Sequence, residues 1–184
     1  MDKNSLLLKI ARDAIESNFN PEVKIDKEFL LSNFSFLNEK QATFVTLTIN
    51  GKLRGCIGSL IAHRILLDDL IYNAKAAAFD DPRFNSLSFS EFNEIKIEIS
   101  LLTAPEILEY KDFEDLKKKL IPNKHGVILE LNGKRATFLP QVWEQLPEFN
   151  AFMVHLCQKA GLNPSSLSAL PKIQTYEVIK IEEE

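Results

Sequence analysis

The stretch QATFVTLTI at residues 41–49, followed by Asn50-Gly51 and by KLRGCIG at residues 52–58, predicts a β-hairpin. The first segment is rich in Thr, Val, Phe and Ile, residue types that favour strands. Asn-Gly suits the two positive φ angles of a two-residue hairpin turn. The hairpin predicts an antiparallel pair of strands, and the rest of the fold is worked out from it.

A second hairpin is expected where residues 127–131 lead through Asn132-Gly133 into residues 134–139. Amphipathic periodicity and capping residues predict helices at 6–19, 26–31, 65–79 and 112–120, and one or two helices between 141 and 160. Strands are predicted at 95–101 and 173–181. Strands that occur as hairpins with helices between them indicate an α+β fold. We expect a mostly antiparallel sheet with flanking helices.

The length of 184 residues suits one domain, so residues 1–184 are predicted to form a single domain. Two cysteines are too few for a disulfide framework and fit a reducing cytoplasm. Charges interrupt every apolar run before it reaches the ~18 residues that a membrane span needs. The net charge of −4 argues against a nucleic-acid-binding protein.

Glycines cluster around Cys56. Of the six glycines in the chain, Gly51, Gly55 and Gly58 fall within eight residues. The turn explains Gly51, whereas a glycine inside a strand indicates a bulge or a close approach of another group. The segment around Cys56 is therefore the first candidate for a functional site.

The register of the first hairpin relates Cys56 to Arg54. With a two-residue turn, Leu47 faces Arg54 and Val45 faces Cys56, so Arg54 and Cys56 share a face at about 6–7 Å. A cation at that distance favours thiolate over thiol. A one-residue bulge at Gly55 would instead move the two side chains to opposite faces.

Other candidate site residues lie elsewhere in the chain. His125, at the start of the second hairpin, would supply the base that thiol catalysis by Cys56 needs. Asp81 and Arg83, in the turn after the helix predicted at 65–79, are candidates for a binding cleft, with a local ion pair as the structural alternative. Cys157 falls on an apolar helical stripe and is predicted to be core. No spacing of cysteines and histidines resembles a metal site, and no motif identifies a cofactor.

Several blocks together resemble the AMMECR-type domain family. Its hexapeptide matches residues 53–58 (LRGCIG), and its A-x-x-D-P-R-F segment matches within residues 76–84. Its K-H-G, L-P-Q-V and L-C-x-K-A-G-L blocks match at residues 124–126, 139–142 and 156–162. Residues 134–137 (KRAT) depart from the small apolar run that the family often has there.

The resemblance implies an α+β fold of two unequal lobes with the hexapeptide near the cleft between them. Beside Cys56 and Arg54, the remaining hexapeptide residues Leu53, Gly55, Ile57 and Gly58 would then line this cleft. The resemblance also implies partners, because family members are encoded with, or fused to, Memo-type proteins and radical SAM enzymes. It implies no particular reaction, substrate or cofactor.

Three interpretations of the hexapeptide stay open. In an enzyme, Cys56 would be a nucleophile or redox thiol, Arg54 would hold an anionic substrate or the thiolate, and His125 would be the base. In a binding module, the glycines would permit close contact with a ligand or partner. In a structural role, Arg54 would pair with a carboxylate, and the glycines would only permit packing.

Overall fold

The computed structural model describes residues 2–183, which fall into two compact units. The first unit runs to Leu102 and includes the chain from Ile179, and the second is Thr103–Val178. Each unit has its own four-stranded sheet and its own hydrophobic core. The predicted α+β class is confirmed, with two separate sheets built around the two predicted hairpins.

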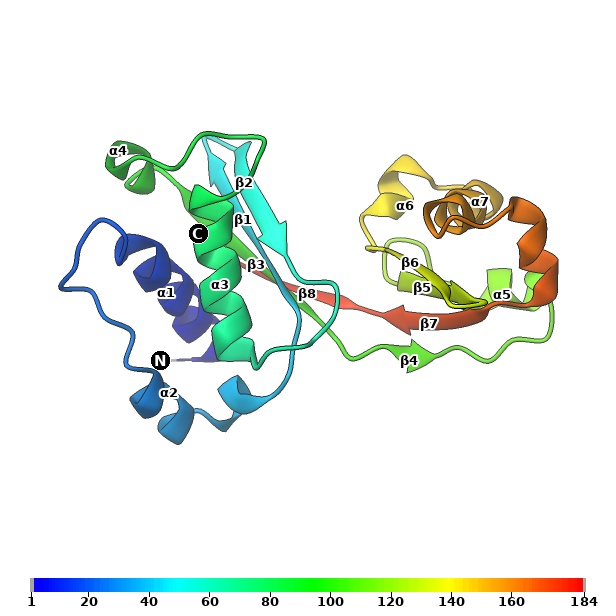
Figure 1. Ribbon diagram of the computed structural model, residues 1–184, viewed down its shortest axis with the longest axis horizontal. Helices are drawn as coiled ribbons and strands as arrows, with labels where there is room; N and C mark the ends of the chain where they lie inside the picture. Colours follow the sequence, from blue (N-terminus) through cyan, green and yellow to red (C-terminus); the bar gives the residue numbers. More distant parts are fainter. Residues whose placement is uncertain (1, 184) are drawn as a thin grey trace. The chain divides into compact units, whose positions relative to one another are not determined.

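In the first unit the sheet order is β2-β1-β3-β8. Its elements are α1 (Lys3–Glu16), α2 (Lys27–Asn33), the 3-10 helix η1 (Ser35–Asn38), β1 (Thr43–Ile49), β2 (Lys52–Gly58), α3 (Leu66–Phe79), α4 (Phe89–Phe92), β3 (Lys96–Leu102) and β8 (Val178–Glu182). Helices α1 and α3 lie side by side and pack on one face of this sheet (Figure 1). That face carries the core of the unit, and β2 is an edge strand.

In the second unit the sheet order is β4-β7-β5-β6, and all its pairings are antiparallel. Its elements are β4 (Glu106–Ile107), α5 (Phe113–Lys119), β5 (Gly126–Leu131), β6 (Lys134–Phe138), α6 (Val142–Gln145), α7 (Phe149–Lys159), the 3-10 helix η2 (Pro164–Ala169) and β7 (Lys172–Tyr176). Its core includes the stacked rings of Trp143 and Phe152. Cys157 is fully buried on α7, as predicted.

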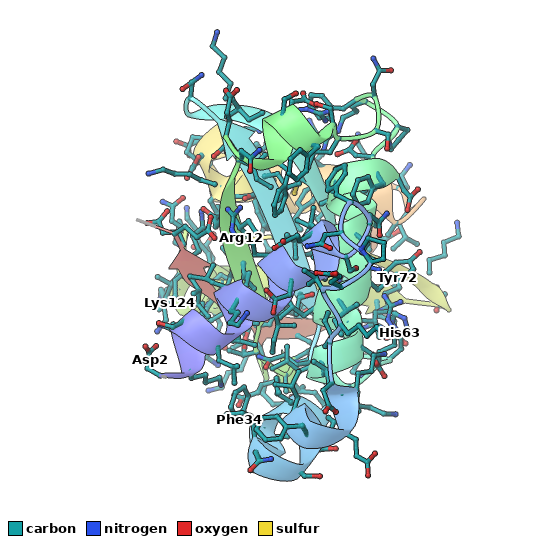
Figure 2. All side chains as sticks on the ribbon, turned by 90° about the vertical axis from the view of Figure 1, so that its left-hand side faces the viewer. Asp2, Arg12, Phe34, His63, Tyr72 and Lys124 are labelled. Atoms are coloured by element: carbon teal, nitrogen blue, oxygen red, sulfur yellow. The ribbon has the colours of Figure 1, made fainter. Side chains whose placement is uncertain are left out.

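The first helix begins earlier than its apolar periodicity predicts. The Asp2 carboxylate accepts hydrogen bonds from the backbone N–H groups of Asn4 and Ser5, so it caps α1 one turn before residue 6. Figure 2 labels Asp2 and, further along the helix, Arg12. Arg12 forms an ion pair of 2.6 Å with Glu183, which joins α1 to the chain after β8.

The predicted strand at 173–181 is wrong as a single strand. Residues 172–176 form β7 in one sheet and residues 178–182 form β8 in the other. Ile173 belongs to the core of the second unit and Ile181 to the core of the first, so the two halves contribute to different cores. Among the described helices, none is long and apolar enough to cross a membrane.

The first hairpin contains a β-bulge, so the register predicted for it is wrong beyond Leu53. Thr48 faces Leu53 as a two-residue turn requires, but Leu47 faces Gly55 instead of Arg54. Arg54 is therefore the extra residue of the bulge. The physical reason is a close contact: a Cβ atom on Gly55 would lie 2.1 Å from the carbonyl oxygen of Ala77 in α3.

The bulge determines which way Cys56 faces. Cys56 lies opposite Thr46, not Val45, and Thr46 Oγ1 lies 3.3 Å from Cys56 Sγ. Val45 and Leu47 are fully buried under the helices. Because side chains alternate along a strand, Cys56 and Thr46 face away from α1 and α3.

A buried polar cluster joins α3 to the hairpin. Asp69 is 1% exposed, and its carboxylate accepts hydrogen bonds from the backbone and hydroxyl of Thr43, both at 2.8 Å, and from Ser59 Oγ at 2.7 Å. Asn73 and Arg64 complete the cluster. Because the Asp69 carboxylate is saturated by these hydrogen bonds, its burial is compatible with a stable core.

We expect Gly55→Ala to destabilise the protein by about 2–3 kcal/mol or more, because the new methyl group meets backbone atoms that cannot rotate away. Gly51→Ala is the matched control: no atom lies within 4 Å of its Cβ position, and it costs only the left-handed φ of +74°, about 1 kcal/mol. Urea unfolding of both variants measures the difference. Equal losses of stability would show that the Gly55–Ala77 contact is not a constraint.

Candidate functional site

The main chain of Cys56 is held by two charged side chains from the turn after α3. Its N–H donates to Asp81 Oδ2 at 2.8 Å, and its carbonyl oxygen accepts from Arg83 Nη2 at 3.2 Å. Because β2 is an edge strand, these backbone groups have no neighbouring strand to pair with on that side. Asp81 and Arg83 take the place of that strand at this one residue.

Asp81 and Arg83 also bind each other. Arg83 Nη2 lies 2.7 Å from Asp81 Oδ2, and the Arg83 N–H donates to Asp81 Oδ1 at 3.0 Å. The hydrogen bond from the Arg83 guanidinium is the main reason that the pKa of Asp81 lies well below its usual range, and the Cys56 N–H contributes although burial opposes it. The same hydrogen bond raises the pKa of Arg83. The structure thus shows the predicted local ion pair, with an added role in holding Cys56.

Arg54 is engaged by the segment between α3 and β3. Its Nε donates to Glu91 Oε1 at 2.8 Å, and its Nη2 donates to the Asn85 carbonyl at 3.0 Å. The guanidinium carbon lies 5.7 Å from the centre of the Phe84 ring, and only 13% of the side chain is exposed. Arg54 Nη1 is buried without a hydrogen-bond partner in the described part of the chain. Arg54 therefore carries the carboxylate pair that the structural interpretation predicts.

Glu91, the partner of Arg54, was not identified from the sequence. It also closes a capping box with Ser88 at the start of α4. Hydrogen bonds from Arg54, first, and then from the Ser88 N–H lower the pKa of Glu91 to about 2. The Ser-x-x-Glu spacing at residues 88–91 is a capping-box signal in the sequence, but nothing in the sequence pairs Glu91 with an arginine 37 positions earlier.

Cys56 is half-buried, and its sulfur has a hydroxyl neighbour. Within residues 2–183, its hydrogen-bond partner is Thr46 Oγ1, and no carboxylate or imidazole bonds to it. No group of three or more metal-ligating side chains occurs in the described part either. Among the described residues of the first unit, the site therefore presents a positioned thiol with no base bonded to it.

His125 belongs to the second unit, where its partners are local. Its Nδ1 accepts the Ile121 N–H at 3.1 Å, and its carbonyl accepts the indole N–H of Trp143 at 3.0 Å. Burial, first, and the charge of Lys124 lower the pKa of His125, and Glu177 opposes them. Because Nδ1 accepts a hydrogen bond, the tautomer that fits this contact carries its proton on Nε2. The pairing of His125 with Cys56 stays a prediction.

The other hexapeptide residues differ in their surroundings. Leu53 is 44% exposed, whereas Ile57 packs against the core of the first unit. A Cβ atom on Gly58 would lie 2.2 Å from the Phe44 ring, so this glycine also permits close packing. Both strand glycines thus contact other parts of the protein, and neither contact requires a ligand.

The pH dependence of stability tests the Arg54–Glu91 pair. Because the pKa of Glu91 falls from 4.5 to about 2 on folding, its contribution is complete above about pH 4.5 and is lost as the pH falls towards 2. Glu91→Gln should destabilise the protein at pH 6 by about 1 kcal/mol, and the difference from wild type should shrink at pH 3. Urea unfolding at both pH values measures it.

Glu22→Gln is the control for that experiment, since Glu22 is exposed and its carboxylate has no ion pair within the described residues. It should change stability little at either pH. A difference between wild type and Glu91→Gln that stays constant from pH 6 to pH 3 would contradict the assignment.

His125 also makes stability depend on pH. Here burial favours the neutral form of the side chain, whereas the Arg54 pair favours the charged form of Glu91. Because folding lowers its pKa below 6.5, the unfolded chain binds the proton more readily, and stability falls as the pH drops below 6.5. An NMR titration of the imidazole should give a pKa below 6.5, and His125→Gln should reduce the loss of stability between pH 7.5 and 5.5. A midpoint at or above 6.5 would contradict the contacts described for this ring.

The chain is similar to proteins from several archaea. It is 35% identical over 175 residues to protein Mbar_A1807 of Methanosarcina barkeri, covering 92% of this chain and 85% of that protein. It is 42% identical over 166 residues to protein LS215_2104 of Saccharolobus islandicus, covering 86% and 71%.

A solved structure shares the fold. The crystal structure of the uncharacterized protein PH0010 from Pyrococcus horikoshii matches with a TM-score of 0.75 and 30% identity, covering 97% of this chain and 90% of that one. The sequence pattern of the AMMECR1 family matches residues 8–181, nearly the whole chain. These matches agree with the resemblance carried by the hexapeptide and its companion blocks. The chain belongs to the AMMECR1 family.

Proposed function

We propose that this AMMECR1 protein is a ligand-binding module centred on Cys56 that acts in the cytoplasm alongside Memo-type and radical SAM proteins. One observation carries the proposal. The main chain of Cys56 is clamped by Asp81 and Arg83, while its side chain faces away from the helices and the residue is only half-buried. A side chain with a rigidly held backbone and an open functional group is suited to recognition.

The surroundings of the sulfur favour binding over catalysis. A thiol nucleophile needs an adjacent base or a cation that lowers its pKa. Thr46 offers only a hydroxyl, the charge of Arg54 is neutralised by Glu91, and the Nδ1 of His125 accepts a backbone N–H. Arg83 is the cation beside Cys56, but its charge is matched by Asp81. We therefore assign Asp81 and Arg83 as positioning residues.

The second candidate function is a protein-interaction module in which the hexapeptide is purely structural. The contacts of Gly55 with Ala77 and of Gly58 with Phe44 favour it, as does the Arg54–Glu91 pair. In that case Leu53 and the rest of the exposed surface would carry the interaction, and Cys56 would be dispensable. The first candidate function requires the Cys56 thiol, and the second does not.

The proposed partners rest on the family and not on geometry. Members of the family are encoded with, or fused to, Memo-type and radical SAM proteins, which suggests a shared process. Both cysteines are free thiols, as a cytoplasmic setting requires. The substrate of that process is left open by this proposal.

Thiol labelling tests the accessibility that the proposal needs. At pH 7.5 iodoacetamide should modify Cys56 in the folded protein, whereas Cys157, which is fully buried, should react only after unfolding in urea. Mass spectrometry of the digested protein reports each site separately. A folded protein in which Cys56 resists the reagent as strongly as Cys157 would overturn the proposal.

Co-purification with Memo-type and radical SAM proteins then separates the two candidate functions. We expect Cys56→Ser to weaken recovery of the partner at least about fivefold, while the matched control Cys157→Ser leaves it unchanged. Cys157→Ser keeps a donor to the Asn163 carbonyl, which Cys157 Sγ contacts at 3.3 Å. Full recovery with Cys56→Ser would favour the interaction module with a structural hexapeptide.

A further inference from the structure

The first unit has a groove beside the end of β2. Its volume is about 530 Å³, and its walls are the last residues of β2, the loop at 59–64 and one face of α3. Figure 2 labels His63 and Tyr72, which line it from the loop and from the helix. Cys56 is not among the lining residues, so any ligand of this groove is independent of the role proposed for that sulfur.

The polar wall of the groove contains an unused hydrogen-bond acceptor. Asn73 is 1% exposed, and its Nδ2 donates to the Thr43 carbonyl at 3.0 Å and to Asp69 at 2.9 Å. Both partners are acceptors, so the amide orientation is determined and Oδ1 points away from them. Within residues 2–183 no group donates to Asn73 Oδ1, although Asn73 lines the groove. A ligand with an N–H group would satisfy it.

Arg64 supplies the complementary donor. Its Nε donates to Asp69 at 3.1 Å and its Nη2 to Ser59 Oγ at 3.2 Å, while the guanidinium carbon lies 4.1 Å from the centre of the Tyr72 ring. These contacts fix the orientation of the Arg64 guanidinium. They leave its Nη1 without an acceptor among the described residues. Asp69 balances the charge of Arg64, so what Arg64 offers a ligand is the N–H group of Nη1, which can donate a charge-assisted hydrogen bond to a carboxylate oxygen.

The rim of the groove is apolar. Leu60, Ile61 and Tyr72 are 39%, 58% and 56% exposed, and all three line it. Three large solvent-exposed apolar side chains around a polar wall are typical of a recognition surface. They are suited to an aliphatic side chain of the ligand.

The edge of β2 adds a backbone site. The N–H of Cys56 points away from β1, since Asp81 accepts it, and backbone groups alternate between the two sides of a strand. The N–H and C=O of Gly58, two residues further along, therefore also face the open edge. Gly58 lines the groove. An extended peptide could pair there by strand addition.

We propose that this groove binds the C-terminal end of an extended partner polypeptide whose last residue is aliphatic. Its carboxylate would accept from Arg64 Nη1, its last N–H would donate to Asn73 Oδ1, and its side chain would lie on Ile61. Arg64 Nη2 and Asn73 Nδ2 both contact the Ser59 hydroxyl, at 3.2 and 3.3 Å, so the two side chains are neighbours in the wall of the groove. The last residue of a polypeptide carries a carboxylate and an N–H together, and it can therefore address both side chains.

Two acetylated peptides of sequence Gly-Thr-Val-Leu, one with a free carboxylate and one with a C-terminal amide, test the proposal by NMR titration of the full ¹⁵N-labelled chain. The free acid should shift the amides of Gly58 and Tyr72 and should bind at least about tenfold more tightly than the amide. Arg64→Lys, which keeps a cation beside Asp69, should abolish most of that preference.

Ile61→Ser should weaken binding of the free acid about threefold or more. Ile179→Ser is the matched control, because Ile179 is 53% exposed but lies outside the groove, and it should bind like wild type. Cys56→Ser should also bind like wild type, which separates this inference from the function proposed above. Equal binding of acid and amide, shifts away from the groove, or no saturable shift at millimolar peptide would overturn it.

Discussion

The approach of Gly55 to the Ala77 carbonyl is the constraint on which the rest of the candidate site depends. A side chain at this position would meet the backbone of α3, so the strand can pack there only with a glycine on its helix-facing side. Placing that glycine opposite Leu47 makes Arg54 the extra residue of a bulge and turns Cys56 away from the core. The absence of a side chain at Gly55 thereby decides which way Cys56 faces.

Charged side chains then satisfy backbone hydrogen bonds along the free edge of β2. Asp81 and Arg83 satisfy the backbone of Cys56, and Glu91 neutralises Arg54 beside the same strand. In these two pairs the charge of each arginine is matched by a carboxylate of the same unit. Beyond the clamped residue the edge is open again, and the groove at Gly58 begins there.

Local patterns predicted most of the secondary structure, including both Asn-Gly hairpins and the end of α3 before Pro82. Two of the errors share a cause, since each depends on contacts between distant segments. The single strand at 173–181 is divided because its halves serve different cores, and the hairpin register shifts because α3 lies against Gly55. Likewise, the buried carboxylate of Asp69 binds Ser59 and Thr43, 10 and 26 positions away, which no short window of sequence reveals.

The sequence alone determined the α+β class, the family and the glycine-flanked cysteine as the segment of interest, because periodicity, turn chemistry and motif blocks are local properties of the chain. Only the tertiary structure decided that Arg54 pairs with Glu91, that Arg83 and Asp81 hold Cys56, and that the histidine's partners lie in the second unit. Which charges neutralise one another depends on which side chains the fold brings within hydrogen-bonding distance, and that distance is a property of packing.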